Sequence, residues 1–84
     1  MPKETIARMK VVERKLGREQ ALGQAHSDGL VEIDPRQVSK EYLDTMIHEM
    51  LHIYFPDTPE WKIAKVATKM ARTLWKSKYR RLMD

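Results

Sequence analysis

The chain has 84 residues, which is enough for one small domain whose limited core would gain stability from a bound metal. A content of 42% hydrophobic and 33% charged residues is typical of a soluble globular protein and excludes a disordered chain. The absence of cysteine excludes disulfides and thiolate metal ligands, so histidine, glutamate and aspartate are the candidate ligands. The net charge of +4 is uneven, because eight basic residues and no acidic residue lie between Trp61 and Arg81.

The chain shows no targeting or membrane segment. Its first ten residues contain no continuous apolar run, and no apolar stretch reaches 18 residues. We therefore expect no signal peptide and no transmembrane helix. A cysteine-free composition also fits the reducing cytosol, so we expect a cytoplasmic protein.

The first half of the chain predicts a small sheet. Residues 3–16 are ambiguous, because apolar residues recur there at near-helical spacing. The β-branched pair Val11-Val12 favours a strand from about Met9 to Leu16. Residues 20–34 predict a β-hairpin, in which the segment Ser27-Asp28-Gly29 forms the turn.

The second half predicts two helices. The first extends from Ser39, its expected N-cap, to Phe55. The second has Thr58 as its expected N-cap and Pro59 at its first position, and it continues to about Arg80. The short link between them predicts an antiparallel pair. The apolar residues expected to face inward are Leu43, Met46, Ile47, Met50, Leu51 and Tyr54 in the first helix, and Ile63, Ala67, Met70 and Leu74 in the second.

The segment HEMLH, residues 48–52, carries the chemistry of the sequence. His48 and His52 are four residues apart on the first predicted helix, so both imidazoles lie on one face and can bind one Zn²⁺. Glu49 lies near the position that a water would take and can accept its proton. Two other interpretations stay open: an ordinary amphipathic helix with a polar side, and a zinc site without activity.

A catalytic zinc usually has three protein ligands and one water. Glu60 is the expected third ligand, because a short antiparallel link brings the first turn of the second helix level with His52. Asp57, in the link, and His26, beside the hairpin turn, are the alternatives. Amide hydrolysis also needs a donor to the developing oxyanion, and the sequence does not choose among Tyr42, Tyr54 and Tyr79.

The motif also supports a resemblance to a known family. HEMLH matches the HExxH signature of the zincin metallopeptidases residue for residue. The wider pattern "DGLVEIDP…TMIHEMLHIYFPD…LWKSKYRR" resembles very small, phage- or prophage-encoded HExxH proteins of the SprT-like or minimal-zincin kind. The chain differs from full-length SprT-like proteins, because it lacks a third downstream histidine and a Cys₄ zinc ribbon.

This resemblance implies a zinc-dependent peptidase that acts on a peptide or protein substrate. His48 and His52 would be metal ligands, and Glu49 would be the general base. The resemblance also implies that the strand just before the active helix, here Leu30 to Asp34, pairs with an extended substrate.

The second predicted helix also carries a basic stripe. Its members recur every three or four residues and are Lys62, Lys65, Lys69, Arg72 and Lys76. Such a stripe can bind phosphates weakly and in a salt-dependent way, although many Lys-rich faces are only solvated.

The predicted fold is therefore α+β and minimal zincin-like, with residues 1–84 as a single metallopeptidase domain. A small antiparallel sheet of two or three strands would pack on two antiparallel helices. The predicted function is a zinc metallopeptidase. The alternatives are a non-catalytic, zinc-stabilised binding module and a nucleic-acid- or partner-binding protein that uses the basic helix. A homodimer also stays open.

Overall fold

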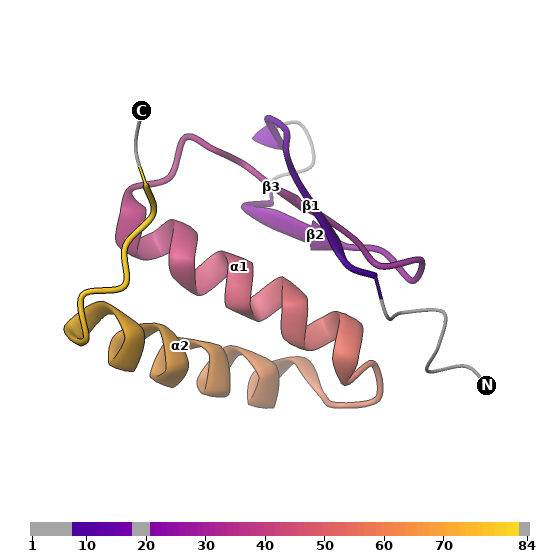
Figure 1. Ribbon diagram of the computed structural model, residues 1–84. Coiled ribbons are helices and arrows are strands. Elements are labelled where there is room, and N and C mark those ends of the chain that lie inside the picture. Colours follow the sequence, from indigo (N-terminus) through magenta and orange to yellow (C-terminus); the bar gives the residue numbers. More distant parts are fainter. Residues whose placement is uncertain (1–7, 18–20, 83–84) are drawn as a thin grey trace.

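The computed structural model describes residues 8–17 and 21–82, so residues 3–7 of the ambiguous N-terminal segment lie outside the described part. A three-stranded sheet lies on one side of helix α1 (Ser39–Tyr54), and helix α2 (Glu60–Lys76) lies on the other (Figure 1). The two helices run antiparallel, as predicted (Figure 1). The α+β fold is thereby confirmed, with α1 as its central layer.

The sheet contains the predicted hairpin. Strands β2 (Gly23–Ala25) and β3 (Leu30–Ile33) are antiparallel. The turn between them places Gly29 at φ 95°, a conformation that glycine adopts without a steric penalty. A β-carbon at Gly29 would also lie 2.8 Å from the carbonyl oxygen of Arg8, so the turn has no room for a side chain there.

The prediction of a wholly antiparallel sheet was wrong. Strand β1 (Lys10–Glu13) pairs with β3 in parallel, and the strand order is β1-β3-β2. After β1 the chain reaches the far edge of the sheet, forms β2 there and returns through the hairpin into the centre. The central strand β3 therefore runs in the same direction as β1. The first strand is also shorter than the predicted segment from Met9 to Leu16.

The ends of the helices differ slightly from the predicted ones. Helix α1 has Val38 and α2 has Pro59 at the N-cap position, one residue away from the expected Ser39 and Thr58. Helix α2 ends at Lys76, four residues before the expected Arg80, because the next residues form a Schellman motif.

In this motif Lys78 takes a left-handed conformation with φ 73°. Its N–H donates to the carbonyl of Trp75, and the N–H of Tyr79 donates to the carbonyl of Leu74. Neither helix in the described part of the chain is long and apolar enough to cross a membrane.

The core has two parts, one on each side of α1. Val31, Ile33, Tyr42 and Ile53 fill the space between the sheet and α1. Ile47 packs against two alanines of α2 in the other part. Small side chains let the helices approach closely, and Leu43, Leu51 and Leu74 pack around this contact. Two residues expected to face inward, Tyr54 and Met70, are exposed.

A buried carboxylate joins the end of the sheet to the rest of the fold. Asp34 follows β3, and it accepts a hydrogen bond from the N–H of the buried Leu16 at 2.9 Å. Its carboxylate also forms an ion pair with Arg36. The Arg36 guanidinium, together with the backbone donors, holds the pKa of Asp34 well below its usual range. This ion pair fixes the segment that leads into α1.

Candidate metal centre

Three side chains from the two helices converge at one end of the helix pair. His48 and His52 lie one turn apart on α1, with ring centroids 4.9 Å apart. The link after Tyr54 returns the chain, so that Glu60 at the start of α2 faces both imidazoles. The Nε2 atoms of His48 and His52 lie 2.9 and 2.7 Å from the two carboxylate oxygens of Glu60.

The geometry of these three residues fits a metal ion. One ligand atom from each residue can be chosen so that all lie within 4.8 Å of one another, and within residues 8–17 and 21–82 no other group of this kind was found. Two imidazoles and one carboxylate form a ligand set that zinc enzymes use. The side chains of His48 and His52 are 21% and 28% exposed, so an ion at this site would be accessible to a substrate from solvent.

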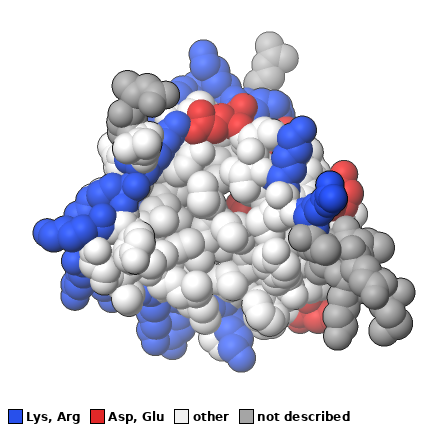
Figure 2. Space-filling view, viewed as in Figure 1, with Lys and Arg blue, Asp and Glu red and all other residues white. Residues whose placement is uncertain are grey.

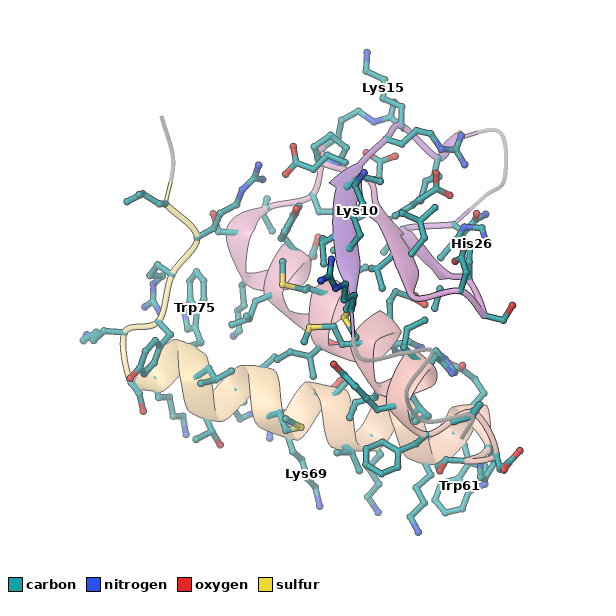
Figure 3. All side chains as sticks on the ribbon, turned by 45° about the vertical axis from the view of Figure 1, so that its right-hand side comes forward. Lys10, Lys15, His26, Trp61, Lys69 and Trp75 are labelled. Atoms are coloured by element: carbon teal, nitrogen blue, oxygen red, sulfur yellow. The ribbon has the colours of Figure 1, made fainter. Side chains whose placement is uncertain are left out.

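The two alternative ligands lie outside this cluster. Asp57 is exposed in the link between the helices. His26 lies on the sheet (Figure 3), and its Nε2 is 2.9 Å from a carboxylate oxygen of Glu32. That carboxylate also forms an ion pair with Arg14, and these two partners lower the pKa of Glu32 to about 2. His26 is thus part of a charged group on the sheet.

Glu49 differs from the other members of the motif, because it is half-buried beneath the edge of the sheet. A β-carbon built on Gly23 of β2 would lie 2.9 Å from Cγ and 3.2 Å from Oε2 of Glu49. The carboxylate therefore lies directly under the β2 backbone. Burial raises the pKa of Glu49, against the opposing effect of His48 and His52. A raised pKa suits a carboxylate that must accept and release a proton.

The strand beside the cluster is β2 and not the strand that the family resemblance implied. Leu30 to Asp34 contains β3, which pairs with β1 on one side and with β2 on the other. Neither edge of β3 is therefore free to bind a substrate, and this expectation was wrong. Among the described residues, β2 has a strand neighbour on one side only.

The outer edge of β2 carries backbone groups that pair with no other strand of the described residues. The carbonyl of Leu22 and the N–H of His26 bond to residues at the two ends of β3, at 2.9 and 2.8 Å. Backbone direction alternates along a strand, so the N–H and C=O groups of Gly23 and Ala25 point to the opposite, outer edge. These groups are available to an extended peptide.

Two hollows lie between β2 and α1, and the first of them is lined by Glu49. One has a volume of about 650 Å³ and is lined by Gly23, Thr45, His48 and Glu49, among others. The other, of about 330 Å³, lies beyond His52 toward the end of α1. Both are large enough for a side chain, so a peptide along β2 would find space in each of them.

The tyrosines do not complete the site. The hydroxyl of Tyr42 donates to Glu13 at 2.7 Å, and its ring lies under the guanidinium of Arg81. Burial, followed by the hydrogen bond to Glu13, raises the pKa of Tyr42 to about 12. Tyr54 and Tyr79 are exposed. Within the described part of the chain, no tyrosine contacts the histidine cluster, so the oxyanion donor is still unassigned.

The basic stripe covers the face of α2 that points away from α1. Lys and Arg side chains gather along this helix at the lower edge of Figure 2, and Lys69 points into solvent in Figure 3. All five members are exposed, whereas Ile63, Ala67 and Ala71 on the opposite face are buried. The guanidinium of Arg80 stacks on the ring of Trp75, 3.5 Å from the ring centre. This face of the Trp75 ring is therefore covered and is not open to a ligand of the stripe.

Comparisons of the chain with models of known protein families, with curated proteins and with solved structures found no match. Function is therefore inferred from the chain's own residues.

Proposed function

We propose that this protein is a cytoplasmic zinc-dependent metallopeptidase that hydrolyses peptide bonds in extended segments of peptides or proteins. The observation that carries the proposal is the placement of the half-buried Glu49 beside a cluster of two histidines and a glutamate. An ordinary amphipathic helix does not require two histidines that share a carboxylate from a second helix, with a half-buried glutamate next to them in the sequence.

The residues present have distinct tasks in this proposal. His48, His52 and Glu60 would hold the metal. A bound zinc ion would polarise the carbonyl of the substrate and lower the pKa of a water molecule. Glu49 would accept the proton from that water and later give it to the departing amine. Its position under β2 keeps the carboxylate near the peptide and out of bulk solvent.

The edge of β2 supports an extended substrate. Gly23 and Ala25 offer a donor and an acceptor each, and a peptide that pairs with them extends the sheet by one strand. Antiparallel pairing gives the better hydrogen-bond geometry. The peptide would then cross over Glu49, with side chains in the two hollows.

A purely structural zinc site is the main competing interpretation. Structural sites are usually closed by four protein ligands, whereas catalytic sites keep one position open. The described part of the chain brings three ligands together. A structural site would also have no need of Glu49, so the open position and the adjacent carboxylate favour catalysis.

Replacement of Glu60 tests the ligand set. We expect Glu60→Gln to weaken zinc binding by at least about tenfold, because a neutral amide is a poor zinc ligand. Asp57→Asn removes a carboxylate three residues away that lies outside the cluster, and it should leave the affinity unchanged. Competition with a chromophoric chelator measures both. Equal zinc affinity of the Glu60→Gln variant and the wild type would remove Glu60 from the site.

Hydrolysis of an unfolded substrate tests the activity itself. The zinc-loaded protein should cleave unfolded casein, and excess chelator should stop the reaction. Tight stoichiometric zinc binding without cleavage of casein or other unfolded proteins would favour the zinc-stabilised binding module.

The exposure of the whole basic stripe favours nucleic-acid binding as a second candidate function. We expect weak binding whose logarithm falls linearly with the logarithm of salt concentration. The Lys65→Gln and Lys69→Gln double variant should reduce that slope by about 1–2, while Lys15→Gln, on the sheet side of the molecule, should not change it. Fluorescence anisotropy of a labelled oligonucleotide measures the slopes. Binding that does not respond to salt would exclude the stripe as the contact surface.

A further inference from the structure

A single side-chain amide connects the edge strand to the helix that carries the HExxH motif. Gln37 lies between β3 and α1. Its Nε2 donates to the carbonyl oxygens of Leu22 and Asp34, at 3.1 and 2.9 Å. Its Oε1 accepts a hydrogen bond from the hydroxyl of Thr45 at 2.7 Å. The residue just before β2, the end of β3 and the middle of α1 thus meet at one group.

Thr45 and Glu49 form the surface on which β2 rests. They are four residues apart on α1, so their side chains lie on the same face of the helix. A β-carbon at Gly23 would lie 2.7 Å from Cγ2 of Thr45 and 2.9 Å from Cγ of Glu49. The strand therefore lies as close to α1 as a backbone without a side chain allows. Glycine permits this approach, and the amide of Gln37 holds it.

We propose that Gln37 is a positioning residue for the proposed peptidase reaction. Through Leu22 and Thr45 it fixes the height of the β2 edge above Glu49, and thereby the place where a bound peptide meets this carboxylate. The inference rests on the proposed function. A peptide bonded to β2 moves with the strand, and a misplacement of about 1 Å at a reacting centre can reduce the rate about a hundredfold.

The hydrogen bonds of Gln37 do more than satisfy buried groups. The carbonyl of Leu22 already accepts a hydrogen bond from the N–H of Asp34 at 2.9 Å. The bond from Gln37 is a second one to the same oxygen, so its loss leaves that oxygen satisfied. Its loss would, however, remove the side-chain connection between β2 and Thr45. The carbonyl of Asp34 and the buried hydroxyl of Thr45 would also lose this partner, so we expect some loss of stability together with the change in strand position.

Four variants separate a positioning role from general stabilisation. Gln37→Met keeps the length of the side chain without its polar groups, and Thr45→Val keeps the shape without the hydroxyl. Thr45→Ser retains the hydroxyl but removes the Cγ2 methyl group against which β2 packs, so it separates the hydrogen bond from the packing contact. Thr68→Val is the matched control, because it removes a threonine hydroxyl of α2 that donates to Asp44 and not to Gln37. Zinc affinity, thermal midpoint, kcat and KM on a quenched fluorescent peptide are measured for each.

We expect Gln37→Met and Thr45→Val to lower kcat by about tenfold to a hundredfold while zinc affinity stays unchanged. Thr45→Ser should lower kcat less than Thr45→Val does, because it keeps the hydroxyl that donates to Gln37. Thr68→Val should keep kcat within about twofold, a much smaller change than a displaced reacting centre produces. A lowered thermal midpoint with wild-type kcat in Gln37→Met and Thr45→Val would overturn the proposal, because Gln37 would then act only on stability.

Amide hydrogen exchange measures how firmly β2 is held, and this measurement does not depend on catalytic activity. The N–H of Asp34 donates to the carbonyl of Leu22, so its exchange reports how firmly β2 is held. We expect this exchange to be faster in Gln37→Met and Thr45→Val, relative to the amides of α2, and unchanged in Thr68→Val. An inactive wild type would refute the peptidase, whereas unchanged exchange in both variants would refute the role of Gln37.

Discussion

Glu49→Gln is expected to abolish the hydrolysis of unfolded casein while leaving one zinc ion bound per chain. The amide keeps the size and much of the hydrogen bonding of the carboxylate but cannot accept a proton from water. General-base catalysis contributes about 10²–10⁴-fold, and the rate should fall by at least this factor. Zinc should remain, because the proposed metal ligands His48, His52 and Glu60 are unchanged. Metal content and casein cleavage are measured on the same preparation.

Asp57→Asn is the control for this carboxylate-to-amide change, since Asp57 is exposed in the link and lies outside the cluster. Its cleavage rate should equal that of the wild type. Full activity in the Glu49→Gln variant would exclude Glu49 as the base. Loss of zinc in that variant would instead show that Glu49 is a metal ligand, and Glu60 would then need another explanation.

The helices of this fold could be predicted from the sequence because their signals are local. Apolar residues at helical spacing gave α1 almost to the residue, and Gly29 identified the hairpin turn. The early end of α2 was missed, because Lys78 takes a left-handed conformation for which glycine would be the usual signal. A helix end made by a lysine leaves no recognisable mark in the sequence.

The direction of β1 could not be predicted in the same way. A short strand can have the same apolar pattern in parallel and in antiparallel pairing. The partner of β1 depends on which strand of the hairpin lies beside it, and the local sequence does not specify this. In the structure this strand is β3, which is therefore the central strand. The proposed substrate edge therefore lies on β2, and not on β3, the other strand of the same hairpin.

In the candidate site, too, residues identified by local spacing could be predicted, whereas residues that depend on contacts between distant segments could not. His48, His52 and Glu49 follow from helical spacing, and Glu60 follows from the short link between the helices. Gly23, Gln37 and Thr45 were missed, because their importance depends on β2 lying against α1. Nothing in the sequence around Gln37 distinguishes it from an ordinary turn residue. Its proposed role depends on the three elements that its amide joins.

Zinc is expected to stabilise this fold strongly, and replacement of both histidines should remove the effect. Helix α2 packs mainly on α1, through Ile47, two alanines and the leucines around them. A metal held by His48, His52 and Glu60 would join the two helices where this contact begins. Zinc at a hundredfold excess over its Kd raises the free energy of unfolding by about 2.7 kcal/mol. For a domain of this size, that corresponds to a rise of about 10–20 °C in Tm.

Thermal melts with added zinc and with chelator measure this difference. The wild type should show the full shift, whereas the His48→Ala, His52→Ala double variant should melt at one temperature under both conditions. His26→Ala is the matched control: it removes the one remaining histidine, which contacts Glu32 on the sheet, and it should keep the zinc-dependent shift. Identical midpoints of the wild type with zinc and with chelator would contradict a metal that links the helices. Stoichiometric zinc in the double variant would place the metal elsewhere in the chain, since Glu60 alone offers too few ligand atoms to hold it.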